Sequence, residues 1–460
     1  MSSTASRRVS MFSTILVVLA ASGLLIVAGC PTTPVDGQTG NSGVTGQYVG
    51  SERCSQCHVN LHTAWSKTLH AGALKTLEDA EQDTNSACLP CHTVGYGKSG
   101  GFIDRATTNV LADVGCECCH GPARDHVDNV NDRSKDPSVT IASSLCGTCH
   151  TGSHHPTIDE WEESSHATVL ETVAEELVAG DANGVQNCGV CHSGDVNYAK
   201  VIMEDEIADD AFVGMDVEDL NGITCAICHD PHAKTNNAAD PDEGRDFQLR
   251  YAEIASPTAT NTIVAATDTT RFNLCGQCHH SRGRDWSSTS RGPHHSVQVN
   301  MLIGEMPVPV GTSALVPSKP SVHGFAPEQC STCHMYRQDF ESEEAPAIAG
   351  HTFQTDFDSC TTACHFIHST KTQAEGAMNT LKQGIQDRLD KIEERLDDWG
   401  DWKYSAEGGP ADQSGIPDEI KKVRFLKAYV ESDGSLGMHN PGYIADILTE
   451  AENLLTSLDL

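Results

Sequence analysis

A five-residue pattern, C-x-x-C-H, recurs along this chain and could carry chemistry at every copy. Its two thiols and its imidazole are groups that form covalent bonds or bind metals. Eight copies are present, at Cys54-Cys57-His58, Cys88-Cys91-His92, Cys116-Cys119-His120, Cys146-Cys149-His150, Cys188-Cys191-His192, Cys225-Cys228-His229, Cys275-Cys278-His279 and Cys330-Cys333-His334. A ninth candidate, with three residues between the thiols, is Cys360-Cys364-His365.

Three chemistries use dense cysteine and histidine, and the spacing separates them. Disulfides require no histidine, and a zinc ribbon requires no histidine directly after its second cysteine. Covalent haem requires both, because two thiols add to the two vinyl groups and the next histidine binds the iron. The pattern therefore predicts about nine covalently attached haem c groups. For the ninth site a disulfide or a degenerate motif remains an alternative. Cys118, inside the third motif, is surplus, and we expect a free, inert thiol there.

A second ligand at each iron would decide what the site can do. A six-coordinate iron shuttles electrons, whereas an iron with an open position can bind a small molecule. The chain contains 23 histidines, enough for two at each of nine irons. The candidate distal ligands are His70, His126, His166, His232, His294, His323, His351 and His439.

Two features qualify these candidates. The pattern Trp65-x4-His70-Ala71 recurs as Trp161-x4-His166-Ala167, which indicates an internal repeat with a haem motif on either side. The adjacent pairs His154-His155 and His294-His295 should each supply one ligand, and the sequence leaves open which.

The N-terminus predicts export. Two arginines precede an apolar run that ends in VAGC at Cys30, a pattern that resembles a lipoprotein signal. We expect residues 1–29 to be removed, Cys30 to carry a lipid, and 30–50 to form a flexible tether; a transmembrane anchor is the alternative. The protein should then be exported and anchored to a membrane, facing the periplasm or the cell exterior. A net charge of −34 argues against nucleic acid as a partner.

The remaining chain predicts elements that hold the motifs. Nine motifs leave room for short helices and loops and little room for β-sheet. We expect residues 51–200 to bind five haems, 201–368 to bind four, and 369–460 to form a helical bundle without haem. Apolar residues at helical spacing predict one long helix from 372, a second over 418–430 and a third that opens at Pro441. The predicted fold class is mainly α with extensive irregular loops and a C-terminal helical bundle.

Three stretches resemble the cytochrome c-554 family over about residues 48–200: YVGSERCSQCHVNLHTAWSKTLHA, CLPCHTVGYGKSGGF and VGCECCHGPARDH. The later motifs are similar to the wider superfamily of hydroxylamine oxidoreductase and the multihaem nitrite reductases. The resemblance implies a mainly helical chain around closely stacked haems with two histidine ligands, and it matches His70, His126 and His166 to distal ligands. The chain lacks the C-x-x-C-K motif of those nitrite reductases.

The sequence thus predicts an exported, membrane-anchored multihaem cytochrome that relays electrons. Its expected partners are other redox proteins or a membrane quinol-oxidising complex. The alternative is an oxidoreductase in which one open-coordinate haem acts on a small nitrogen or sulfur compound.

Overall fold

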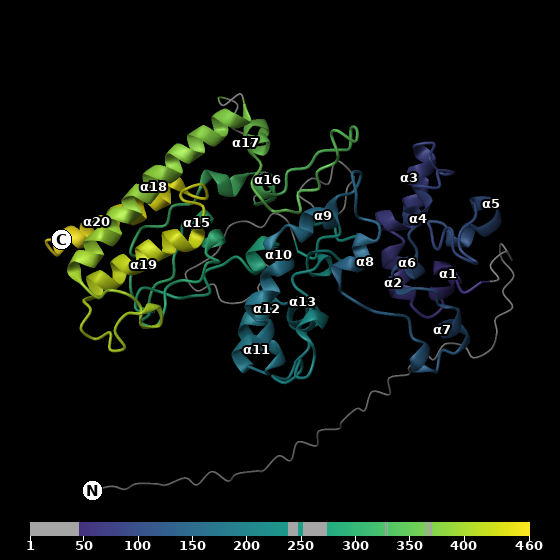
Figure 1. Cartoon of the computed structure of the whole chain (residues 1–460), viewed down its shortest axis with the longest axis horizontal. Helices are drawn as coiled ribbons and strands as arrows, with labels where there is room; N and C mark the ends of the chain where they lie inside the picture. The colour runs from purple at the N-terminus through teal and green to yellow at the C-terminus, as the bar shows by residue number, and fades with distance from the viewer. Residues whose placement is uncertain are drawn as a thin grey trace, which may run out of the picture. The chain divides into compact units, whose positions relative to one another are not determined.

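The computed structural model describes residues 46–237, 247–251, 274–326, 328, 330–363, 365, 367 and 370–460. Within these residues the regular structure is helical, and β pairing is limited to four isolated bridges (Figure 1). This confirms the predicted fold class. The predictions for the signal segment, Cys30 and Cys364 lie outside the described residues.

The helices that precede the C-terminal segment are only one or two turns long. Their bounds are α1 (Ser51–Cys54), α2 (Val59–Trp65), α3 (Ala73–Asp79), α4 (Leu89–His92), α5 (Arg105–Thr108), α6 (Cys116–His120), α7 (Arg124–Asp128), α8 (Ser143–Gly147), α9 (Thr157–Glu162), α10 (Ser165–Thr168), α11 (Ala174–Val178), α12 (Gly189–His192), α13 (Gly194–Asn197), α14 (Cys225–Cys228), α15 (Gln298–Ile303), α16 (Cys330–His334) and α17 (Phe357–Ala363). Helices this short are unstable alone, so their positions depend on contacts with other groups.

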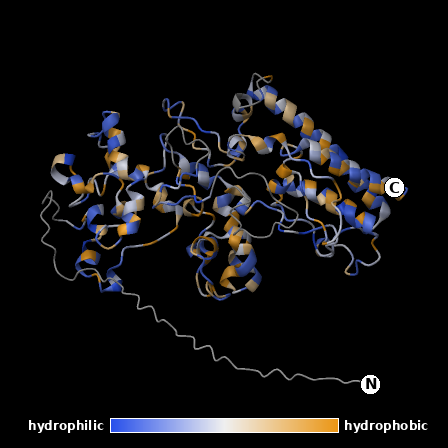
Figure 2. Ribbon diagram, turned by 180° about the vertical axis from the view of Figure 1, so that it is seen from behind, coloured by the Kyte–Doolittle hydropathy of each residue, from blue (hydrophilic) through white to orange (hydrophobic). Residues whose placement is uncertain are grey.

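Three long helices end the chain: α18 (Lys371–Trp399), α19 (Asp418–Asp433) and α20 (Pro441–Ser457). All three were predicted, and α20 begins where the sequence indicated. The side chain of Asn440 accepts a hydrogen bond from the Tyr443 N–H, and Pro441 occupies the first helical turn. The long helices carry both hydrophobic and hydrophilic residues, as amphipathic packing requires (Figure 2).

The largest cluster of buried apolar side chains lies around α18, α19 and α20. The predicted stripe on α18 supplies Ile385, Leu389, Ile392 and Leu396, which pack into the largest of three apolar clusters. The other two clusters are small: one centres on Leu177 and the other on Leu111. The haem-motif region therefore has little side-chain core of its own, which leaves space for bulky groups. Among the described residues, no helix is long and apolar enough to cross a membrane.

Candidate haem-binding sites

Four of the C-x-x-C-H motifs lie on a single helical turn. In α6 and α16 the whole motif is helical, and α4 and α12 end at the histidine of theirs. Residues three and four apart share a helix face. One turn therefore points both thiols and the imidazole to the same side, where one macrocycle could receive all three.

Eight of the nine predicted proximal histidines face a second histidine ring within the described residues. Two imidazoles bound to one iron, each at a metal–nitrogen distance of about 2.0 Å, would have ring centroids about 6.2 Å apart. The observed centroid separations are 6.4 Å for His58–His126, 6.2 Å for His150–His70, 6.1 Å for His120–His232, 6.2 Å for His279–His166, 5.9 Å for His192–His294, 6.2 Å for His229–His351, 6.1 Å for His365–His323 and 6.2 Å for His334–His439. All eight candidate distal histidines are in this set, and each gap has room for one iron atom.

Many candidate iron-binding histidines form a hydrogen bond through Nδ1, which leaves Nε2 for the metal. Six Nδ1 atoms donate to backbone carbonyl oxygens: His92 to Ala73 at 2.8 Å, His120 to Ser138 at 2.8 Å, His229 to Phe247 at 2.6 Å, His323 to Met438 at 2.7 Å, His334 to Phe353 at 2.9 Å and His351 to Ala349 at 3.0 Å. A carbonyl only accepts, so Nδ1 must carry the proton and Nε2 keeps a free lone pair. This outer bonding is typical of metal-binding histidines.

Burial favours the neutral imidazole that a metal requires. Burial, followed by the nearby His279, lowers the pKa of His166 to about 4. Burial and the neighbouring His70 likewise lower the pKa of His150 to about 4. Both rings are thus uncharged at neutral pH and able to bind iron.

Large apolar side chains flank several of these histidines and are exposed. Val59 and Leu61 follow His58, and Phe325 follows His323 in the 3-10 helix η10 (Val322–Phe325). Their exposed fractions are 58%, 50% and 73%. Scattered exposed apolar residues are ordinary, but these three lie within three residues of a ligand candidate along the chain. Apolar surface next to a ligand candidate fits a bound porphyrin.

The internal repeat seen in the sequence has one geometry in both copies. The Trp65 indole N–H donates to the Val114 carbonyl at 3.1 Å, and the Trp161 N–H donates to Ile223 at 3.0 Å. Each acceptor lies two residues before a haem motif. Each tryptophan therefore ties the segment before a later haem motif to the helix that leads to a candidate distal histidine.

Thiols from different motifs lie close enough to affect each other's pKa. Side-chain interactions of this kind join Cys54 to Cys116, Cys91 to Cys149, Cys146 to Cys225, Cys191 to Cys278 and Cys333 to Cys360. Longer-range electrostatic interactions relate Cys119 to Cys149, Cys228 to Cys278 and His279 to His334. Together these interactions relate all nine motifs in one connected set, an order that the sequence could not reveal.

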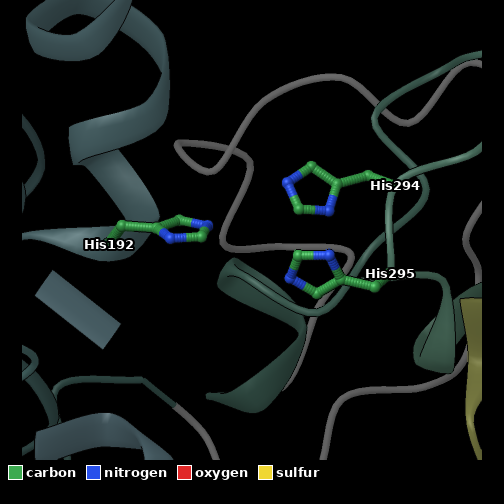
Figure 3. A group of neighbouring side chains, drawn as sticks. All are labelled: His192, His294 and His295. Carbon is green, nitrogen blue, oxygen red and sulfur yellow. The ribbon is translucent and has the colours of Figure 1, made fainter. Parts of the chain in front are cut away.

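The fifth motif faces two imidazoles. His192 lies 5.9 Å from His294 and 6.2 Å from His295 between ring centroids. Their candidate ligand atoms all lie within 4.8 Å of one another. Figure 3 shows both rings pointing a nitrogen toward His192. The structure thus leaves the choice within this adjacent pair open.

The second motif is different. The Nδ1 of His92 is bonded to Ala73, but no ring-to-ring pair involves His92 in the described part of the chain. His155 is one candidate partner, since burial, and next the neighbouring His92, lower its pKa. His155 also lies 6.3 Å from His150, the centroid separation expected across one iron.

Several acidic residues that support these sites were missed from the sequence. Glu117, inside the third motif, is 4% exposed and accepts bonds from Val49, Gly50 and Ala123. Glu160 accepts from the His351 N–H, and Asp433 contacts His439. Nothing in their sequence context distinguishes them from other acids, and some of their partners, such as Val49 for Glu117 and His351 for Glu160, lie far away along the chain.

Cys118 is half-buried within the third motif. Its Sγ lies 3.7 Å from the Thr93 carbonyl oxygen. Burial, with a smaller contribution from Cys119, raises its pKa to about 12. The thiol is therefore protonated at neutral pH, as an unreactive cysteine is.

Comparison with known proteins now bears on what these sites hold. Residues 53–121 match the family model of cytochrome c554 and c-prime. Cytochrome c-554 of Nitrosomonas europaea is 26% identical over 168 residues, which are 33% of this chain and 58% of that protein. The resemblance found in the sequence is therefore confirmed over the N-terminal part.

Two solved structures share the fold over most of the chain. The outer cell wall cytochrome OcwA has a TM-score of 0.58 at 19% identity, covering 89% of this chain and all of that one. An undecahaem cytochrome from the S-layer of Carboxydothermus ferrireducens has a TM-score of 0.59 at 19% identity, covering 90% of this chain and 70% of that one. The chain has the fold of a multihaem c-type cytochrome.

Proposed function

We propose that the protein is a nonahaem cytochrome c that relays electrons. The observation that carries this proposal is the set of eight opposed histidine pairs at the spacing of two imidazoles across one iron. Haem iron supplies the chemistry, since it exchanges one electron between its ferric and ferrous states. The two cysteines of each motif would attach the haem covalently, and the following histidine and the opposed histidine would be its two iron ligands.

Two histidines at each of eight irons would leave no position there for a substrate, which favours transfer over catalysis. The interactions between motifs support a continuous route. The interaction of Cys54 with Cys116 joins the first motif to the third, and that of Cys146 with Cys225 joins the fourth to the sixth. The eighth and ninth meet at Cys333 and Cys360. The first and ninth motifs are then at opposite ends of the route.

The proposed location is outside the cytoplasm, with a lipid on Cys30 and the tether of residues 30–50. The names of the two structural neighbours place those proteins in an outer cell wall and an S-layer, which is compatible with a relay to the cell exterior. The partners would be other redox proteins or a membrane quinol-oxidising complex.

The test is a haem count combined with electron paramagnetic resonance of the oxidised protein. Nine haems per chain by the pyridine haemochrome method, with low-spin signals at eight or nine of them, are expected. A count of eight haems per chain would mean that the Cys360-Cys364-His365 site does not attach a haem. Several high-spin haems per chain would contradict a dedicated relay.

A second function follows from the second motif alone. Because His92 has no opposed ring at pairing distance among the described residues, its iron could keep an open position. The protein would then be an oxidoreductase acting there on a small nitrogen or sulfur compound. One high-spin haem that binds cyanide or nitric oxide would support this reading, and its loss in a His92→Met variant would locate it.

A further inference from the structure

A buried carboxylate touches the candidate distal ligand of the eighth motif. The Asp433 side chain is fully buried at the end of α19, and its Oδ1 lies 2.6 Å from the Nδ1 of His439. The other oxygen, Oδ2, accepts a hydrogen bond from the Ser435 hydroxyl. The Ser435 oxygen in turn accepts from the His439 backbone N–H at 3.1 Å. Hydrogen bonds among Asp433, Ser435 and His439 thus fix the carboxylate against the imidazole.

Within the described part of the chain, Asp433 forms no ion pair with a lysine or arginine. The nearby Lys382 acts electrostatically on His439 but does not pair with the carboxylate. The closest analogue is Asp136, whose Oδ1 lies 3.2 Å from the His126 Nδ1, but Asp136 is 29% exposed and pairs with Arg133 at 3.1 Å. The carboxylate of Asp433 beside His439 is therefore more deeply buried than that of Asp136 beside His126, and it lacks the arginine partner that Asp136 has.

The neighbouring site provides a natural contrast. His323, opposed to His365 of the ninth motif, donates its Nδ1–H to the Met438 carbonyl at 2.7 Å. Met438 and His439 are consecutive, so one short loop between α19 and α20 orients ligands at two sites. One ligand has a neutral acceptor and the other a charged acceptor.

We propose that Asp433 is a positioning residue that lowers the reduction potential of the haem attached at Cys330 and Cys333. A carboxylate that accepts from Nδ1–H makes the imidazole a more basic ligand. A more basic ligand stabilises the ferric iron, which carries one more positive charge than the ferrous iron. In a buried site with low dielectric constant, the full charge of Asp433 adds to this effect.

The consequence is a step in potential between two adjacent sites. The eighth haem would hold its electron less tightly than the ninth, whose distal histidine faces only a carbonyl. The C-terminal helices would then tune the relay as well as pack against it. This inference rests on the proposed function, because it requires His439 to bind iron.

The experiment compares the holoprotein with an Asp433→Asn variant in a redox titration followed by electron paramagnetic resonance and visible spectra. Asparagine keeps the shape and the oxygen acceptor but removes the charge. We expect one haem to become easier to reduce by at least tenfold in its equilibrium constant, or 59 mV for one electron. The low-spin signal of that haem should change, because its axial ligand is less basic.

The control is Asp446→Asn, which removes one negative charge from α20 at a 46% exposed side chain paired with Lys319. It should shift no haem by more than about twofold, because the charge is screened by solvent. Equal shifts in the two variants, or no shift with Asp433→Asn, would overturn the inference.

A third variant covers failure of Asp433→Asn to fold. Ser435→Ala removes the hydroxyl that shares the Asp433 charge, so the potential should move in the opposite direction, downward. An unchanged or raised potential in a variant with full haem content would contradict the inference. These outcomes are separate from the proposed function, which fails only if the unmodified protein lacks the haem count or the low-spin signals.

Discussion

Glu117 provides the sharpest test of how the first site is assembled. Its carboxylate accepts from the Val49 N–H at 2.9 Å, the Gly50 N–H at 2.8 Å and the Ala123 N–H at 2.9 Å. The first two precede α1, which ends at Cys54, and the third precedes α7, which carries His126. One buried group thus fixes both the attachment side and the distal side of the haem at His58.

The perturbation is Glu117→Gln, which keeps the size of the side chain and removes its charge. An amide has one oxygen, so its NH2 group must face at least one of the three N–H donors. A hydrogen bond to a charged group contributes about 1.5–3 kcal/mol, and a buried unpaired donor costs about 1–3 kcal/mol. Losing one bond and weakening the others should lower the local opening free energy by about 3 kcal/mol, or more than a hundredfold in the opening equilibrium.

Hydrogen exchange measured by mass spectrometry on the folded holoprotein reads this opening directly. The amides of Val49, Gly50 and Ala123 should exchange about a hundredfold faster in the variant, whereas amides of α18 keep their rates. Glu52→Gln is the matched control, since its side chain is 81% exposed on the neighbouring α1. Exchange in Glu117→Gln within threefold of the unmodified protein would refute the reasoning.

Three further predictions concern other parts of the chain. Because His294 and His295 both face His192, each single alanine variant should stay low-spin, and only the double variant should gain one high-spin haem by electron paramagnetic resonance. Burial raises the pKa of Glu305, so its ionised form opposes folding above that pKa, and the penalty disappears below the unfolded-state pKa. Glu305→Gln should therefore raise the melting temperature at pH 7 and leave it unchanged below pH about 4, followed by circular dichroism. Asn440→Ala removes a cap and the Nδ2–H bonds to Met301 and Lys319, and should lower stability by about 2–4 kcal/mol in denaturant titrations read at 222 nm.

The sequence predicted local chemistry better than long-range geometry. The haem motifs and the helices from Lys371 onward depend on neighbouring residues, so spacing was enough to find them. The pairing of His126 with His58 or of His439 with His334 depends on distant contacts, and histidine content alone could only nominate candidates. Acids such as Glu117 left no signal, because a buried carboxylate and an exposed one look alike in a sequence.

The histidine pairs also explain how such a chain could fold. Each pair joins segments far apart: His166 faces His279, and His334 faces His439. The helices that carry the motifs are too short to be stable alone, and closing loops of this length costs entropy that two small apolar clusters can offset only in part. Bonds from both histidines to one iron would close each loop and add a large apolar surface to the core. The N-terminal region should therefore fold only as haem is attached, whereas α18, α19 and α20 have an apolar core of their own. The buried Asp433 belongs to α19 of the apolar helical core and also contacts His439, a candidate iron ligand, so it connects the part that packs by itself to the part that depends on haem.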